Sequence, residues 1–399
     1  MTTVYFCGRL IDCLHDGTQQ KRYLTVCNGI IQSISDTCPK KYDELLDWSD
    51  YTVMPGLINC HTHVGILPTA DNDLVLTYPP AQRTVFILQH LRELLASGVT
   101  TIRDLGCYDN FDLQIRDFIR GGEVLGPDMY AAGPMLTMTG GHAHKVGVEC
   151  DGVDECRKAT RERLKSGVDL IKVMSTGGVL TRGVEPGAAQ LSKEELTVIC
   201  EEAHKAGRLV STHAQGNTGI RNALAAGVDT VEHGFFMDQE IVDTMVKNRT
   251  YYVPTFCAPY FMATMGEALG LAQEFIDKVM NSLEAHAKSF EMALRSGVKI
   301  ACGTDAGTPF NGFDQTAREI LLMHEHGMTP QQALRAATVT AAECIGLSDR
   351  GVLAEGKRAD LIAVEADPLS APERLLDGVR FVVRAGRCYN TAALKEKLS

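Results

Sequence analysis

The chain has 399 residues, of which 45% are hydrophobic and 22% are charged, and its formal net charge at pH 7 is −11. These proportions are typical of an ordinary globular protein. The sequence contains no basic cluster of the kind that neutralises phosphates, so nucleic acid is excluded as an expected partner.

The N-terminal residues, the length of the apolar stretches and the cysteines bear on where the protein resides. Residues 1–9 lack the basic segment and the long apolar segment of a signal peptide. No stretch approaches the roughly 18 apolar residues that span a bilayer, so no membrane segment is expected. The 13 cysteines include no CxxC pair, which favours reduced, buried thiols over a cysteine-rich zinc module. We therefore expect a cytoplasmic protein.

Short apolar runs separated by turn residues fill the first fifty residues, and the same pattern recurs near the C-terminus. The runs are 4–6, 23–26, 30–34, 359–364 and 379–384. Such runs are typical of strands joined by turns. We predict a small β-sandwich domain formed from residues 1–55 and 350–399.

The middle of the chain, residues 56–349, has a different rhythm, in which short apolar runs alternate with longer helix-like segments. The runs are 53–59, 99–102, 129–132, 170–174, 208–212, 230–232, 251–254 and 298–301. Alternating strands and helices with near-continuously apolar strands indicate a parallel sheet covered by helices. Eight such units predict an α/β fold with a (β/α)8 TIM-like barrel.

Polar residues interrupt these runs where the strands are expected to end. They are His61, His63, Lys172, His213, His233 and Asp305. Side chains at the carboxyl ends of barrel strands line the active site. Two histidines two residues apart face the same side of a strand, and imidazole with carboxylate suits Zn²⁺. His61, His63 and Asp305 would hold one ion, and His213 with His233 a second.

Lys172 lies inside an apolar strand, where a bare ammonium is costly. A carboxylated lysine is an anion that can bridge two cations, and two metal ions together can activate a water and polarise a carbonyl. The alternative is that Lys172 only pairs with a nearby acid. Isolated histidines are also often structural, as we expect for His324 and His326 in a helix-like stretch. The joint occurrence of all six residues at strand ends favours the metal site.

The segment 54–63, Met-Pro-Gly-Leu-Ile-Asn-Cys-His-Thr-His, resembles the strand-one signature of the amidohydrolase superfamily. The resemblance covers nearly the whole chain, including 351–361, where such chains return to their β-sandwich. Within the superfamily the chain is most similar to binuclear Xaa-Pro dipeptidases and related zinc carboxypeptidases. The segments that resemble them are 170–178, 211–214, 231–234 and 303–306.

The resemblance implies two divalent ions, expected to be Zn²⁺, bridged by carboxylated Lys172. His61, His63 and Asp305 would bind the more buried ion, and His213 and His233 the more exposed one. A bridging hydroxide would attack an amide carbonyl, and Asp305 would act as the base that returns the proton to the leaving amine. The loop 139–142 would present His142 to the substrate, unless this imidazole only structures the loop.

Two other functions stay open. A mononuclear deaminase or imidazolone-type hydrolase of the superfamily generally has a Glu a few residues after the strand-five histidine, whereas residues 214–217 contain no acid. A non-catalytic assembly protein on the same fold would usually lack several ligands, and none of the six is missing.

The substrate is expected to be a small molecule or dipeptide, either Xaa-Pro-like or an N-acyl amino acid. Lys145 and Arg182 are candidates for its carboxylate, or else ordinary surface charges. The segment 257–275 is expected either to cap an apolar pocket or to pack as helix. The resemblance also implies a homo-oligomer.

Overall fold

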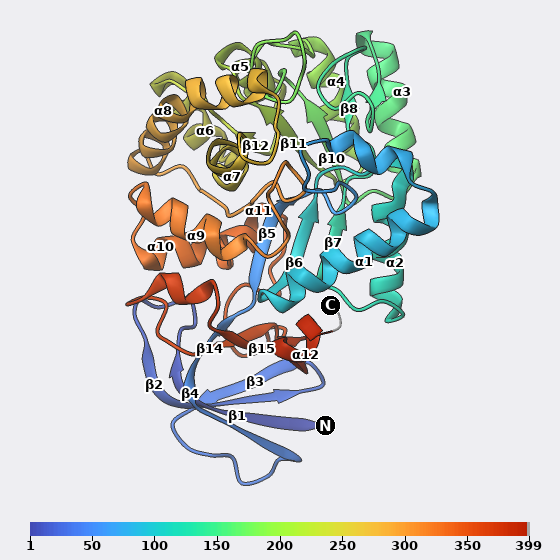
Figure 1. Ribbon diagram of the computed structural model, residues 1–399. Coiled ribbons are helices and arrows are strands. Elements are labelled where there is room, and N and C mark those ends of the chain that lie inside the picture. Colours follow the sequence, from blue (N-terminus) through green and yellow to red (C-terminus); the bar gives the residue numbers. More distant parts are fainter. Residues whose placement is uncertain (397–399) are drawn as a thin grey trace.

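The computed structural model describes residues 1–396 and contains one sheet built from both ends of the chain (Figure 1). Its strands run in the order β16-β15-β14-β4-β1-β2-β3. They are β1 (Thr2–Leu10), β2 (Gln19–Cys27), β3 (Ile30–Ser35), β4 (Glu44–Pro55), β14 (Leu361–Val364), β15 (Val379–Arg384) and β16 (Arg387–Asn390). Neighbouring strands are antiparallel except β1 and β4, which are parallel.

The terminal sheet has its own apolar core, in which Tyr5, Trp48 and Leu361 are buried. The rings of Tyr5 and Trp48 lie 4.6 Å apart between centroids, and Trp48 stacks on Phe381 at 5.2 Å. The expected sandwich is, in the described residues, a single continuous sheet. The reason is that β14 pairs with β4 on one side and with β15 on the other, which joins the strands of the two termini.

The middle of the chain forms two all-parallel sheets, ordered β13-β12-β11-β10-β8-β9 and β5-β6-β7. Their strands are β5 (Leu57–Thr62), β6 (Val99–Asp104), β7 (Asp128–Ala131), β8 (Leu136–Thr137), β9 (Val148–Glu149), β10 (Leu170–Met174), β11 (Leu209–Ala214), β12 (Thr230–His233) and β13 (Tyr251–Val253). Most of these strands are completely buried, which explains their near-continuous apolar sequences.

The segment expected as the eighth strand lies between β13 and β5 but is not a regular strand. Ala301 N–H donates to Tyr252 C=O at 2.9 Å, and Cys60 N–H donates to Cys302 C=O at 2.8 Å. A Cβ at Gly303 would lie 2.7 Å from the Cβ of His61, so only glycine allows the backbone to approach β5 so closely. The segment leads directly to Asp305.

Helices surround the parallel strands on their outer side (Figure 1). They are α1 (Pro80–Ala96), α2 (Phe111–Gly121), α3 (Gly152–Lys165), α4 (Lys193–Lys205), α5 (Asn217–Ala226), α6 (Gln239–Asn248), α7 (Cys257–Met265), α8 (Gln273–Arg295), α9 (Thr316–Glu325), α10 (Pro330–Ala336) and α11 (Val339–Cys344). Helix α12 (Thr391–Glu396) instead lies beside β15 of the terminal sheet, and the short 3₁₀ helices are η1 (Asn72–Thr77), η2 (Tyr108–Asn110) and η3 (Pro372–Leu375). Local sequence defines several helix ends: Ser192 and Glu195 form a capping box on α4, and Gly122, with φ 85°, ends α2.

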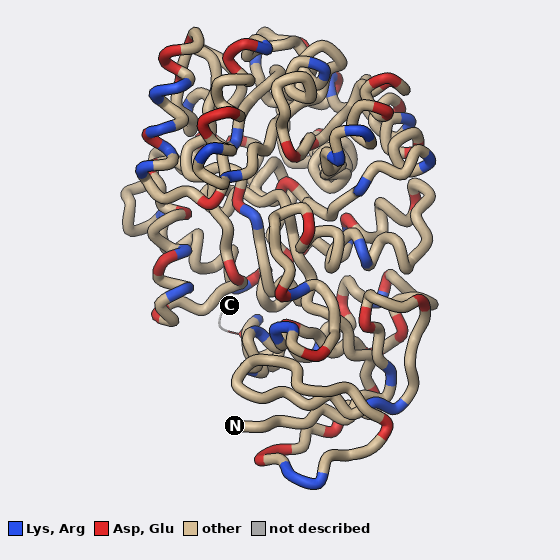
Figure 2. Tube along the Cα trace, turned by 180° about the vertical axis from the view of Figure 1, so that it is seen from behind, with Lys and Arg blue, Asp and Glu red and all other residues tan. Residues whose placement is uncertain are grey.

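Charged residues of both signs are interspersed along these helices (Figure 2). No helix of residues 1–396 is long and apolar enough to cross a membrane.

The terminal sheet meets the amino ends of the parallel strands at Asp128, the first residue of β7. Arg350 Nη1 donates to Asp128 Oδ2 at 2.7 Å, Arg384 Nε donates to Oδ1 at 3.1 Å, and Arg358 also pairs with Oδ2. Burial opposes ionisation, yet the guanidinium groups of Arg358, Arg384 and Arg350 hold the pKa of Asp128 well below its usual range. One carboxylate thus connects β7, β15 and the segment 350–358 that leads to β14. We name these four residues the junction cluster.

Candidate metal centre

The opposite, carboxyl ends of the strands bring the candidate metal ligands together. His61 is on β5, Lys172 on β10, His213 on β11 and His233 on β12, and all four are at most 4% exposed. The imidazole centroids of His61 and His233 are 5.1 Å apart, and those of His213 and His233 are 4.5 Å apart. Parallel strands place their carboxyl ends at one edge, which explains how residues separated by up to 172 positions converge.

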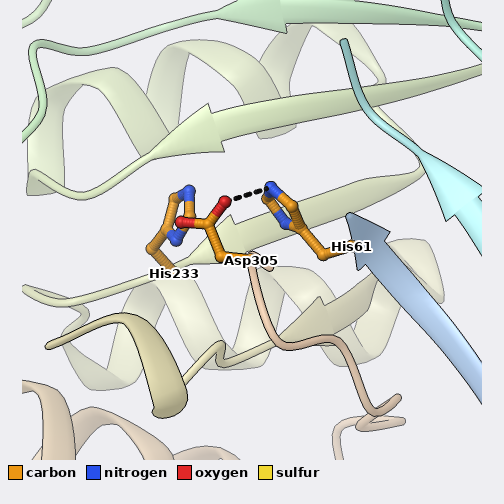
Figure 3. A group of neighbouring side chains, drawn as sticks. All are labelled: His61, His233 and Asp305. Atoms are coloured by element: carbon orange, nitrogen blue, oxygen red, sulfur yellow. Dashed lines mark ion pairs between the residues drawn. The ribbon is translucent and has the colours of Figure 1, made fainter. Parts of the chain in front are cut away.

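Asp305 faces these histidines from the segment after Gly303. Its Oδ1 lies 3.2 Å from the Nε2 atoms of both His61 and His63, whose ring centroids are 5.2 Å apart. Figure 3 shows the side chains of His61, His233 and Asp305 directed toward one another. Their ligand atoms lie within 4.8 Å of each other, the spacing of a group that could hold one metal ion. His233 thus lies close both to His61 and Asp305 and to His213, and the predicted division of these ligands between two ions stays a prediction.

The hydrogen bonds behind three of the rings determine which nitrogen faces the centre. Nδ1 of His61 contacts Glu232 Oε2 at 2.9 Å, and Nδ1 of His63 contacts the carbonyl of Gly106 at 3.1 Å. Carboxylate and carbonyl oxygens can only accept, so both Nδ1 atoms bear hydrogen. Each Nε2 atom then faces the Asp305 carboxylate, where the ring either donates a hydrogen bond as an imidazolium or, when neutral, offers its lone pair to a cation. The donor set fits a divalent metal ion.

His233 is held in the same way. Its Nδ1 contacts Thr255 Oγ1 at 2.7 Å, and that hydroxyl donates to the carbonyl of Pro254 at 2.6 Å, so Nδ1 is the donor toward Thr255. His233, Thr255 and Asp305 all have left-handed backbones, with φ of 71°, 57° and 60°. Such conformations cost about 1–3 kcal/mol each in residues other than glycine and cluster at functional sites.

Lys172 is the least satisfied polar group of the cluster. Its side chain is 2% exposed, and within the described residues its Nζ atom has no hydrogen-bond partner. Burial lowers the pKa of Lys172 to about 8, although the carboxylates of Glu232 and Asp305 oppose the shift. The neutral amine, which is the form that reacts with CO₂, is therefore accessible near neutral pH. The bridging role of Lys172 and the ligand roles of the other five residues stay predictions.

His142 lies beside the cluster in the loop between β8 and β9. Its ring is 4.2 Å from that of His213 between centroids, and its Nδ1 is 2.7 Å from the hydroxyl of Thr181. Burial lowers the pKa of His142 to about 4 and lowers the pKa of His213 well below its usual value. Nε2 of His213 has no hydrogen-bond partner among residues 1–396. Both rings are thus neutral at pH 7, and a neutral imidazole is the form that binds metal.

Other residues considered from the sequence have ordinary partners. Lys145 pairs with Asp73, and the Arg182 guanidinium lies over the ring of Phe275 at 5.4 Å. His324 and His326 have structural contacts: His324 Nδ1 bonds to the Met328 carbonyl at 2.7 Å, and the ring of His326 stacks on that of Phe256 at 4.4 Å between centroids. The segment 257–275 forms α7 and the loop to α8, packed over Val179 and Phe235.

The sequence analysis missed the groups behind the metal centre, above all Glu232 and Arg103. Both are buried charged residues within apolar strands, and Arg103 Nη2 donates to Glu232 Oε1 at 2.8 Å. Each is a charged residue within an apolar strand, as Lys172 is, so both could have been recognised from the sequence as candidate site residues. The partners Thr255 and Thr181 lie in loops and left no comparable signal.

The chain resembles known proteins over nearly its full length. The model of the amidohydrolase family matches residues 52–388. The ochratoxinase of Aspergillus niger is 35% identical over 405 aligned residues, which cover 92% of this chain and 82% of the relative. The structure of a Xaa-Pro dipeptidase with bound methionine superposes with a TM-score of 0.91 at 32% identity, covering 98% of this chain and all of that one. A prolidase complexed with N-methylphosphonate-L-proline reaches the same TM-score at 27% identity, with equal coverage.

Proposed function

The chain belongs to the amidohydrolase family, and we propose that it is a binuclear metal-dependent hydrolase that cleaves an amide bond in a small substrate. The observation that supports two metals rather than one is Lys172. Its buried Nζ lies unpartnered among imidazoles and the Asp305 carboxylate. An unsatisfied buried amine is costly, and a carboxylated amine bridging two cations removes that cost. In the same proposal the parallel strands form a distorted (β/α)8 barrel completed by residues 299–306.

Two divalent ions, proposed to be Zn²⁺ on the six predicted ligands, would supply an activated water and polarise the substrate carbonyl. Asp305 would accept the proton of the attacking water at a carboxylate oxygen. It would then deliver this proton to the leaving nitrogen, which prevents an amide anion from departing. His142, held at Nδ1 by Thr181, would present its other ring nitrogen to the substrate. The burial of the centre would exclude bulk water from the reaction.

The names of the relatives support an amide substrate with a free carboxylate nearby. One similar structure is a Xaa-Pro dipeptidase, another is a prolidase, and the first holds methionine in its active site. We propose dipeptides of the Xaa-Pro type or N-acyl amino acids as substrates. The apolar cluster of Val179, Phe235, Met262 and Phe275 lies in the loops after β10 and β12 and in helices α7 and α8, and it favours substrates with an apolar group on one side of the scissile bond.

The test is a screen of zinc-loaded protein, prepared in bicarbonate buffer, against a library of dipeptides and N-acyl amino acids. Release of free amine measures hydrolysis, and elemental analysis measures the metal content. We expect two zinc ions per chain and amine release that disappears on chelation. Two bound ions without cleavage of any amide would contradict the proposal.

The main rival is a mononuclear deaminase or cyclic amide hydrolase of the same family. The group of His61, His233 and Asp305 would suffice for one ion, so the metal count separates the two. One ion per chain with ammonia released from an amino-heterocycle would favour this rival. Failure to bind zinc or manganese would favour a non-catalytic assembly protein instead.

A further inference from the structure

Glu232 lies directly behind the metal centre and is completely buried. Its Oε2 accepts from His61 Nδ1 at 2.9 Å, while Oε1 accepts from Arg103 Nη2 at 2.8 Å and from the hydroxyl of Ser211 at 2.8 Å. The hydroxyl of Thr230 is a fourth donor, at 2.5 Å from Oε1. Four donors thus hold this carboxylate, three at Oε1 and one at Oε2. Because both oxygens are held by protein groups and the side chain is completely buried, Glu232 is not placed to exchange a proton with a substrate.

His61 differs from the other two rings of known orientation in the kind of group that holds it. The Nδ1 of His63 is held by a backbone carbonyl and that of His233 by a hydroxyl, whereas His61 is held by an ionised side chain. A carboxylate behind an imidazole fixes the tautomer and ring orientation and makes the metal-facing nitrogen more basic. Of these three rings, His61 therefore presents the strongest donor to the centre.

Arg103 holds Glu232 in place. Besides the bond to Glu232, its Nε donates to the Cys60 carbonyl at 2.6 Å and its Nη1 to Thr230 Oγ1 at 3.2 Å. Three of its donors are thus directed to two neighbouring parts of the site, to Cys60 on β5 and to Thr230 and Glu232 on β12. Burying such an ion pair seldom adds stability compared with apolar residues of the same size. Its position next to a ligand points to a role in the site.

We propose that Glu232 is a positioning residue that holds His61 in the tautomer with a free Nε2, and that Arg103 clamps Glu232 in that geometry. The proposal rests on the proposed function, since it concerns how the same site binds metal. The carboxylate acts through His61 and touches neither metal nor substrate.

The decisive variant is Glu232→Gln, which keeps the shape of the side chain. The glutamine amide has one accepting oxygen and one donating NH2 group, so its NH2 group must face the N–H of either Arg103 or His61 and one of these hydrogen bonds is lost. We expect the affinity for one of the two zinc ions to fall about 10- to 100-fold, measured by competition with a chromophoric chelator. The visible spectrum of the cobalt-substituted protein should also change, because the geometry of one ligand changes. Glu232→Asp, which withdraws the carboxylate by one methylene, should show the same loss and serves if the glutamine variant does not fold.

Asp128→Asn is the matched control, because it also removes a carboxylate bound to arginines but lies at the other end of the strands. It should lower thermal stability and leave zinc affinity and the cobalt spectrum unchanged. If wild type binds two ions and both Glu232 variants bind them equally well, the positioning proposal is wrong while the proposed function stands. If wild type itself does not bind two ions, the proposed function fails.

Discussion

The two ends of the parallel strands each contain a cluster of buried charges, and the clusters differ in whether their groups are satisfied. At the amino ends, both carboxylate oxygens of Asp128 pair with guanidinium groups of the junction cluster. At the carboxyl ends, Lys172 Nζ and His213 Nε2 have no partner within the described residues, and the Nε2 atoms of His61 and His63 face the Asp305 carboxylate.

This difference indicates a structural role for the junction cluster and a functional role for the cluster at the carboxyl ends. A satisfied network is complete in the folded chain and holds two parts of it together. An unsatisfied one costs free energy unless a ligand completes it. The same division applies to barrels generally, in which the carboxyl face contains the active site and the amino face supports stability. The predictions below test whether the two clusters can be disrupted independently.

The largest effect is expected from Asp305→Asn. The variant keeps an oxygen ligand but cannot take up a proton, so the metal content should stay near two ions while kcat falls by about 10²- to 10⁴-fold. Steady-state kinetics with elemental analysis of the same preparation measures both. An active Asp305→Asn variant would show that another group is the base.

Lys172→Ala should break the carboxyl-end cluster at its centre. Without the carboxylated amine, at least one metal equivalent should be lost, and most activity with it. Because the unsatisfied Nζ also disappears, the melting temperature of the metal-free protein should not fall. A full complement of two ions in this variant would contradict the bridging role.

Asp128→Asn should break the junction cluster and leave the metal centre intact. Removing one partner of a buried ion pair leaves the others uncompensated, so the free energy of unfolding should fall by about 3 kcal/mol. Denaturant titration measures this loss. A variant of unchanged stability that has lost zinc would overturn the division between the two ends.

The pH dependence of stability should follow from the same carboxylate. The folded pKa of Asp128 lies well below the unfolded value of about 3.9, so its contribution is complete above that value. As the pH falls toward the folded pKa, the unfolded chain takes up the proton first and this stability is lost. Unfolding free energies measured from pH 6 to pH 2 should therefore decline more steeply in wild type than in Asp128→Asn.

The smallest effect is expected from Lys145→Ala. Lys145 and Asp73 form a surface ion pair in which both side chains are about half exposed. Such pairs contribute about 0–1 kcal/mol, so stability should change little. Unchanged kcat and KM would also exclude Lys145 as the group that binds the substrate carboxylate, whereas a large rise in KM alone would restore that role.

Much of the site could be predicted because its residues stand out within their own strands. His61, Lys172, His213 and His233 each interrupt or end an apolar run. In the structure the ligand atoms of His61, His233 and Asp305 lie within 4.8 Å of one another, and the ring of His213 lies 4.5 Å from that of His233. The grouping of His233 with His61 could not be predicted, since it depends on how the ends of β5 and β12 face each other across the strands. The alternation of strands and helices was equally visible from sequence.

The sequence by itself determined the parallel α/β architecture, the pairing of both termini in one β domain and the residue types at the strand ends. These follow from the periodicity of apolar residues and from the rule that strand ends meet at one edge. Tertiary structure alone decided which groups satisfy each other. Arg103 and Glu232 are 129 residues apart, and Asp128 and Arg384 are 256 apart. Hydrogen bonds act over about 3 Å, so only the packed chain distinguishes a polar group that has its partner from one, such as Lys172 Nζ, that has none among the described residues.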